Sequence, residues 1–175
     1  MKKVLKFAPL CALLLALVAF ILLLAGEALV HDYELLGKFH DYYSGPAVIF
    51  GSGTYVVANV KDTLADAKGA WNAILSFIFM IVALVVLLVS SVMVFVKIKA
   101  LEKFGGIIAL VAGGLLLVAG IFLFFSKGAF ASANDAENLL KDYNLGAAWI
   151  VSAILAILGG VASACPAILA LVEKK

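Results

Sequence analysis

The chain contains two histidines, and both begin the same tripeptide, His-Asp-Tyr, at His31 and His40. Histidine beside a carboxylate is typical of metal ligands and of general acid–base groups. The spacing of nine residues places the two imidazoles about half a turn out of phase on a helix, and on opposite faces of a strand. We therefore expect that the repeat does not form one shared site by itself.

A different set of side chains would align if the preceding helix continued beyond residue 26. Glu27, His31 and Glu34 stand at i, i+4 and i+7, on one helix face, and they are suitable ligands for a divalent metal. Lys38 extends the same stripe and would repel a cation. We favour a solvated helix face, so these three residues stay metal candidates only, and no metal ligand, catalytic residue or cofactor is assigned.

Other signals of catalysis or nucleotide binding are missing from the sequence. There is no Walker phosphate loop, no paired-cysteine motif and no His-Glu-x-x-His. The basic residues are all lysine, which disfavours bidentate phosphate recognition, and the net charge of +2 does not favour nucleic acid. Gly51-Ser52-Gly53 is more simply a tight turn than an anion nest. We predict a protein that is not an enzyme.

Four long apolar runs must position these residues. The chain is 66% hydrophobic and 14% charged, and the runs contain no Asp, Glu, Lys, Arg or His. Each reaches the roughly 20 residues that a helix needs to cross the hydrocarbon core. We predict one all-α membrane domain, residues 1–175, with helices over about 5–26, 71–96, 104–126 and 145–172, and with outer loops over 27–70 and 127–144.

Lysines orient these helices in the cell membrane. They cluster before the first run, between the second and third, and at the end of the chain: Lys2, Lys3, Lys6, Lys97, Lys99, Lys103, Lys174 and Lys175. Positive charge is retained on the cytoplasmic side, so both termini are predicted to be cytoplasmic and both longer loops to be outside. Trp71, Trp149 and Tyr143 fall where an outer aromatic belt is expected.

The first run has a second interpretation. It resembles a signal peptide with Gly26 and Ala28 as a small-residue cleavage pair. Its apolar core of about 19 residues exceeds the 7–15 of a usual signal peptide, so we favour a retained membrane anchor. Cys11 and Cys165 lie inside apolar runs, where we expect packed small side chains in preference to a disulfide or an acylation site.

The outer loops should carry a small β-structure. Val48–Phe50 and Tyr55–Val57 are β-branched or aromatic and flank Gly51 and Gly53, which predicts a hairpin over 46–60. Residues 61–71 are expected to lead helically into the second span. A helix is predicted within 126–144, capped by Ser132 or Asn134. We expect the tyrosines and Phe39 to pack under the hairpin and the histidines to face water.

Small residues should set the contacts between spans, because lipid gives helices no hydrophobic reason to associate. They recur at four-residue spacing in the fourth run and at seven-residue spacing in the third: Ala148, Ser152, Ala156, Gly160, Ala164, Gly106, Gly113 and Gly120. We predict a left-handed bundle of four helices packed within one chain, with self-association as the alternative. The absence of ionisable residues from the spans disfavours proton-coupled carriers and redox pumps.

The final third resembles a known family. "EKFGGIIALVAGGLLLVAGIFLF" and "NLGAAWIVSAILAILGGVASACP", within residues 102–166, are similar to the third and fourth spans of claudins and their relatives in the peripheral-myelin-protein tetraspan superfamily. The resemblance implies a left-handed four-helix bundle with an outer sheet built mainly by the first loop. Residues 27–70 lack the tryptophans and cysteines of that family's first loop, so barrier and pore functions do not transfer.

These observations predict an integral membrane structural or interaction protein. It would act through its outer loop or as an accessory subunit of a membrane complex, embedded in the lipid bilayer and bound to a protein partner or to itself. A small oligomeric channel or transporter subunit is the alternative. An enzyme that uses the outer acids and histidines ranks last.

Overall fold

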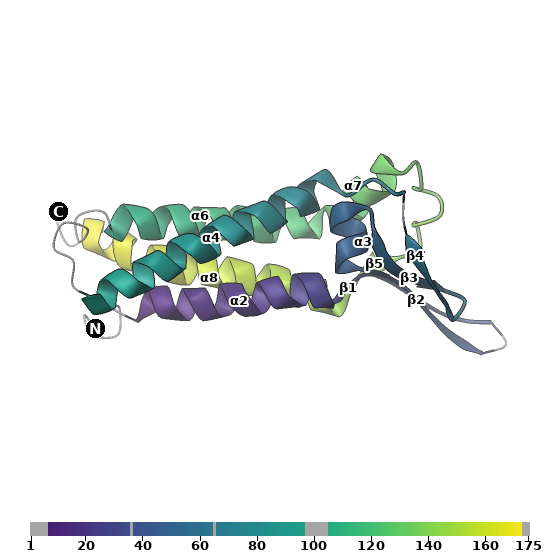
Figure 1. Ribbon diagram of the computed structural model, residues 1–175, viewed down its shortest axis with the longest axis horizontal. Helices are drawn as coiled ribbons and strands as arrows, with labels where there is room; N and C mark the ends of the chain where they lie inside the picture. Colours follow the sequence, from purple (N-terminus) through teal and green to yellow (C-terminus); the bar gives the residue numbers. More distant parts are fainter. Residues whose placement is uncertain (1–6, 36, 65, 97–104, 173–175) are drawn as a thin grey trace.

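Four long helices run side by side and carry a small sheet at one end (Figure 1). The computed structural model describes residues 7–35, 37–64, 66–96 and 105–172. The helices are α2 (Ala8–Ala25), α4 (Trp71–Val96), α6 (Gly105–Phe124) and α8 (Ala147–Val172). All four are long and apolar enough to cross a membrane, so the predicted multi-pass membrane protein is confirmed.

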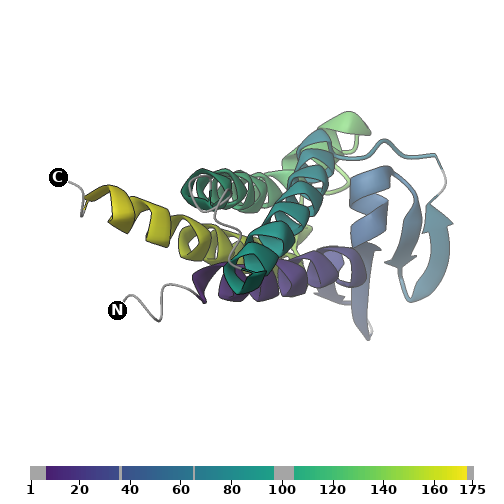
Figure 2. The ribbon, with the colours of Figure 1, turned by 60° about the vertical axis from the view of Figure 1, so that its left-hand side comes forward.

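The predicted spans agree with these helices to within a few residues. α6 ends two residues before 126, and α8 begins two residues after 145. Residues 5, 6 and 104 lie outside the described residues, as do the lysine clusters that orient the spans. α2 begins and α8 ends at the end of the bundle opposite the sheet, which puts both longer loops on one side (Figures 1 and 2).

The sheet is antiparallel and draws its strands from both loops. Its order is β4-β3-β2-β1-β5. The strands are β1 (Glu27–Glu34), β2 (Lys38–Ser44), β3 (Gly53–Val57), β4 (Val60–Leu64) and β5 (Asn144–Leu145). β5 belongs to the second loop and pairs with β1 at Leu29 and Val30. We call the sheet and its connecting segments the cap.

The predicted strand over Val48–Phe50 is wrong, because this segment is the short helix α3 (Gly45–Phe50). Pro46 suits the first turn of a helix, where the missing N–H costs nothing, and Gly51 ends it in the left-handed region with φ 71°. Ala47, Val48 and Ile49 are buried, whereas Phe50 is exposed. The predicted strand over Tyr55–Val57 is confirmed as part of β3, and its hairpin turns at Ala58 and Asn59, with φ 50° and 63°.

The helical lead predicted over 61–71 is also wrong. Residues 61–64 belong to β4, and residues 66–70 form no helix. A helix is present within 126–144 as α7 (Ser126–Ala133), but it lies earlier than expected: Ser132 is inside it, Asn134 caps its C-terminal end, and residues 135–143 form no helix. The Asn134 side chain accepts a hydrogen bond from the Lys68 N–H (2.7 Å) and donates one to the Lys68 carbonyl (2.8 Å), so it ties the two loops together.

Polar side chains inside the bundle are used to join helices. Each donates to a backbone carbonyl of a neighbouring helix: Ser76 to Ala119 (2.9 Å), Asn72 to Phe122 (3.1 Å), Ser163 to Ala109 (2.8 Å), Ser152 to Ala19 (2.7 Å) and Trp149 Nε1 to Leu23 (3.0 Å). Such groups need partners because water is absent from the hydrocarbon region. Trp149 is therefore buried and is not part of an aromatic belt, whereas Trp71 is 60% exposed.

The small residues at four-residue spacing in α8, which we call the ladder, contact two neighbouring helices, α2 and α6. A step of four residues advances about 40° beyond a full turn, so the ladder winds around the helix. Near its start, Ala148 lies against Gly26 and Ser152 bonds to α2. Near its end, Gly160 and Ala164 approach Gly113 of α6. The four-residue spacing therefore does not form one flat face, and these contacts within the chain support intramolecular packing.

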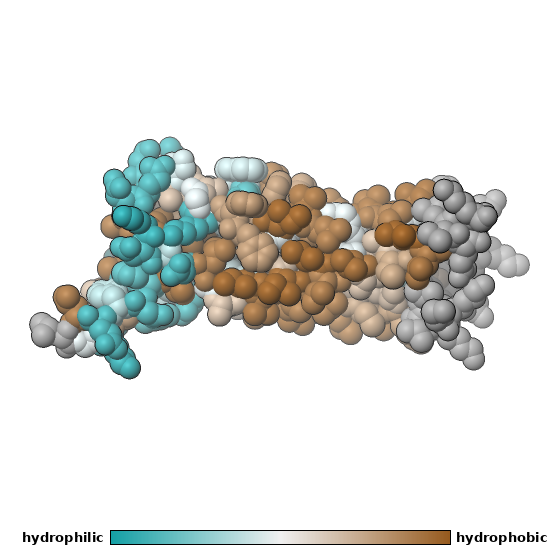
Figure 3. All heavy atoms as spheres, turned by 180° about the vertical axis from the view of Figure 1, so that it is seen from behind, coloured by the Kyte–Doolittle hydropathy of each residue, from teal (hydrophilic) through white to brown (hydrophobic). Residues whose placement is uncertain are grey.

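The glycines of α6 behave differently along the helix. A Cβ on Gly113 would lie 2.7 Å from the Gly160 carbonyl oxygen, and one on Gly120 would lie 2.7 Å from that of Ala153. Ala156 of α8 is fully buried, but Gly106 is exposed. Cys11 and Cys165 are exposed as well, so the prediction that they are packed is wrong. Hydrophobic residues cover the bundle, and hydrophilic residues gather over the cap (Figure 3).

Candidate functional site in the cap

Glycines allow close backbone contacts within the cap and between the cap and the bundle. A side chain at any of five positions would collide with the backbone of another segment or with Ala148: Gly26, Gly45, Gly51, Gly69 and Gly146. Gly45 faces the Leu23 carbonyl of α2, and Gly146 faces the Glu27 carbonyl of β1. The Gly45 N–H donates a hydrogen bond to the Gly26 carbonyl (3.0 Å), and the Gly146 N–H donates one to the Ala28 carbonyl (2.9 Å). We call this contact the junction.

Beyond the junction, β1 and β2 form a hairpin with two chemically different faces. His31 stands opposite Asp41, and Asp32 stands opposite His40. Neighbouring residues of a strand point to opposite faces, so the two histidines are on different sides, as predicted. The register shifts between Glu27 and Leu29. This irregularity places Glu27 on the side of His40, which it contacts.

The metal candidates do not share the helix face that suggested them. Glu27, His31 and Glu34 lie in strand β1, where His31 and Glu34 point to opposite faces because they are three residues apart. Within residues 7–35, 37–64, 66–96 and 105–172, no group of three His, Cys, Asp or Glu side chains is arranged to hold a metal ion. The helical premise of the candidate site is therefore wrong.

One face of the hairpin is an aromatic cluster that packs onto the rest of the cap. The Tyr33 ring lies 5.2 Å from Phe39, and the Tyr43 ring lies 5.6 Å from Tyr143 and 5.7 Å from Phe130. The expected packing therefore holds for Tyr43, which is buried, whereas Tyr33 and Phe39 stack on each other at the outer end and Tyr42 lies on the opposite face beside His40. The His31 ring belongs to the same cluster, 4.9 Å from Tyr33, so the expectation that both histidines face water is wrong for His31.

A buried carboxylate lies within this aromatic face. Asp41 is 4% exposed, and its Oδ1 accepts a hydrogen bond from the Ala58 N–H at the β3–β4 turn (2.7 Å). Burial, reinforced by the charges of Tyr43 and Asp41, raises the pKa of Tyr143, which keeps this phenol protonated at physiological pH. Through its hydrogen bond with Ala58, Asp41 joins the β1–β2 hairpin to the β3–β4 hairpin and so has a structural role.

The other face is polar and centres on His40. Its Nδ1 lies 2.6 Å from Asp32 Oδ1, and its Nε2 lies 3.0 Å from Glu27 Oε2. A neutral imidazole has one N–H, so only protonated His40 can donate to both carboxylates. The hydrogen bond to Asp32, followed by that to Glu27, raises the pKa of His40 against the opposing effect of burial. Lys38 lies 3.8 Å from Glu34 on the same face.

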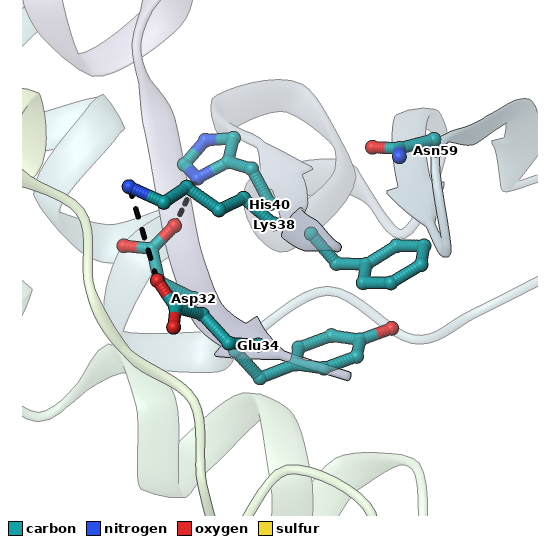
Figure 4. A pocket seen from close by; sticks show the side chains of 7 residues that line it. Asp32, Glu34, Lys38, His40 and Asn59 are labelled. Atoms are coloured by element: carbon teal, nitrogen blue, oxygen red, sulfur yellow. Dashed lines mark hydrogen bonds and ion pairs between the residues drawn. The ribbon is translucent and has the colours of Figure 1, made fainter. Parts of the chain in front are cut away.

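The outer part of the hairpin borders an open depression of about 510 Å³ (Figure 4). Charged side chains and the stacked pair of Tyr33 and Phe39 contribute to it. Its lining is Asp32, Tyr33, Glu34, Lys38, Phe39, His40 and Asn59. The lining offers carboxylates, a cation and aromatic rings but no serine or cysteine. Such a surface can bind a charged or aromatic group of a partner.

Sequence reasoning missed the pairing of His40 with Asp32 and Glu27. The signal was present at Leu35-Leu36-Gly37, where glycine favours a turn and the Leu35 N–H donates to the Gly37 carbonyl (3.0 Å). A hairpin closed at this turn brings residue 32 opposite residue 40. The junction glycines were missed because nothing in a single sequence tells which backbone segments approach one another.

The chain matches no protein-family model, and no curated protein sequence is significantly similar to it. The claudin-like resemblance of residues 102–166 therefore stays a prediction.

Proposed function

We propose that this protein is a structural or interaction protein of the cell membrane, claudin-like in architecture, whose cap contacts a protein partner outside the cell. The observation that carries this proposal is the contrast between its two parts. The four helices contain no Asp, Glu, Lys, Arg or His, and buried serines such as Ser76, Ser152 and Ser163 bond to neighbouring helices. The charged and open surface is in the cap.

A path through the single bundle is disfavoured by its packing. Gly113 and Gly160 allow α6 and α8 to approach so closely that a Cβ on either would lie 2.7 Å from a backbone oxygen of the other helix. Within the described residues, Ser91 alone has a buried side-chain oxygen without a hydrogen-bond partner. Transport would thus require a pore between copies, which is the channel alternative.

The proposed orientation of the protein in the membrane rests on the distribution of its lysines. In the sequence, the lysine clusters precede α2, separate α4 from α6 and follow α8, and positive charge is retained in the cytoplasm. The cap is then extracellular and both termini are cytoplasmic. The seven-residue spacing of Gly113 and Gly120 at the α6–α8 contact favours a left-handed bundle, because a repeat of 3.5 residues per turn supercoils to the left.

Orientation is tested by cysteine labelling in intact cells. The background carries Cys11→Ala and Cys165→Ala, because both native thiols are exposed. Leu139, 69% exposed in the cap, is changed to cysteine and treated with a membrane-impermeant maleimide. We expect labelling without permeabilisation. Labelling only after permeabilisation would place the cap in the cytoplasm.

Partner binding is tested by photo-crosslinking from the cap. A benzophenone amino acid replaces Leu35, 68% exposed at the hairpin end, and Val85, 57% exposed on α4, serves as the matched control. We expect a discrete crosslinked protein from position 35 that is missing from position 85. A discrete self-crosslinked oligomer that conducts ions in planar bilayers would instead favour the channel alternative.

A further inference from the structure

We propose that His40 is a pH-operated clasp, which in its protonated form fastens the β1–β2 hairpin and on losing a proton releases one of its two carboxylate partners. The two ring nitrogens lie on different edges of the imidazole, and each faces its own carboxylate, at 2.6 Å and 3.0 Å. The contact with Asp32, in the outer part of β1, is visible in Figure 4.

The clasp spans the base and the outer part of the hairpin. Glu27 is the first residue of β1 and follows the junction glycine Gly26, whereas Asp32 lies five residues further along the strand. His40 belongs to the partner strand β2. One side chain therefore joins the fixed end of β1, the outer part of β1 and the neighbouring strand.

The balance of charge around His40 changes when its imidazole gains or loses a proton. β1 contributes Glu27, Asp32 and Glu34 to this face, and β2 contributes Lys38 and the neutral Tyr42, whose ring is 5.7 Å from the imidazole. Lys61 of β4 lies on the same side of the sheet, because Val56 of β3 pairs with both Tyr42 and Lys61. On this side of the sheet, three carboxylates thus accompany three cations when His40 is protonated and two when it is neutral.

Loss of the proton reverses one of the two contacts. The nitrogen that loses its hydrogen becomes an acceptor, and it then faces a carboxylate oxygen that is also an acceptor. Because the pKa of His40 in the folded protein is raised above its ordinary value of about 6.5, the clasp is complete below that value. It is lost as the pH rises through the folded-state pKa. The hairpin is therefore held more tightly in acid.

Hydrogen exchange of the full chain in detergent, measured by mass spectrometry from pH 5 to pH 8, tests the proposal. After correction for the intrinsic effect of pH, we expect protection of residues 27–34 and 38–44 to fall several-fold as pH rises. Protection of residues 53–64 should stay constant. In His40→Gln the pH dependence should vanish, whereas His31→Gln should keep it, because His31 lies on the opposite face.

A second measurement covers the case in which His40→Gln does not fold. The imidazole of His40 is titrated by NMR in the native sequence and in Asp32→Asn. We expect titration above the ordinary histidine value in the native protein and a downward shift in the variant. Titration of native His40 at or below the ordinary value, or unchanged pH-dependent protection in a folded His40→Gln, would overturn the clasp. Neither result depends on whether the cap binds a partner.

Discussion

The junction and the outer part of the β1–β2 hairpin lie at opposite ends of the cap, and they are stabilised differently. At the junction, Gly45 and Gly146 bring backbone against backbone with no room for a side chain. At the outer part, exposed charges such as Glu34 and Lys38 are held only by other exposed charges. Close packing fixes a position independently of solvent, whereas exposed ion pairs respond to pH and salt. The cap thus has a fixed base and a responsive end.

The largest effect is expected in the bundle below the junction, at Gly160. Leucine there would collide with the Gly113 carbonyl, so Gly160→Leu should separate α6 from α8 and prevent a folded bundle. Gly106→Leu, on the exposed part of α6, is the control and should leave expression and size unchanged. Size-exclusion profiles in detergent measure both. Equal behaviour of the two variants would show that the α6–α8 contact is not tight.

At the junction itself, Gly45→Val should destabilise the protein by about 3 kcal/mol, because the added atoms meet the Leu23 carbonyl and overpack a buried site. Thermal unfolding in detergent measures the change. Gly128→Ala in α7 is the control, since a Cβ there meets nothing within 4 Å and alanine favours a helix. If both variants unfold at the native temperature, the junction is not closely packed.

A smaller effect is expected between the two regions, at Asp41. Asp41→Ala leaves the N–H of Ala58 without its acceptor and should cost about 1–3 kcal/mol. Asp142→Ala removes an equivalent charge from an exposed position and should change little. The unfolding temperatures of the two variants give the comparison. A native-like Asp41→Ala would mean that the β3–β4 turn does not depend on this carboxylate.

The smallest effect is expected at the outer part of the hairpin. Lys38 and Glu34 are 90% and 77% exposed, and such pairs contribute little to stability. Lys38→Ala should leave the unfolding temperature unchanged, and its effect should be restricted to hydrogen exchange of the hairpin at low salt. A marked loss of thermal stability would contradict the difference between the two regions.

The spans were predictable because membrane crossing is a requirement on composition and length, and both can be read along the chain. α3 was not, because Val48 and Ile49 favour a strand by themselves, and only burial between the sheet and the bundle makes them a helix. The winding of the α8 ladder follows from 3.6 residues per turn and could have been derived. The hydrogen bonds between the Asn134 side chain and the Lys68 backbone could not be predicted, because they join residues 66 positions apart and depend on the tertiary fold.

The site was predictable only in part. His31 and His40 lie on opposite faces, as predicted, but the reason is the register of the hairpin, which pairs His31 with Asp41, and not odd spacing along one strand. The contact between His40 and Glu27 needs the register shift beside Ala28, which no residue pattern indicates.

The two-residue strand β5 has a mechanical consequence. β1 follows α2 directly, and β5 leads through Gly146 into α8, so the pairing of Leu29 with Leu145 links the ends of two helices. A partner that pulls on the hairpin would load this antiparallel pair along its strands, where Leu29 pairs with Leu145 and Val30 with Asn144. We therefore expect the pairing of β5 with β1 to distribute tension on the cap between α2 and α8.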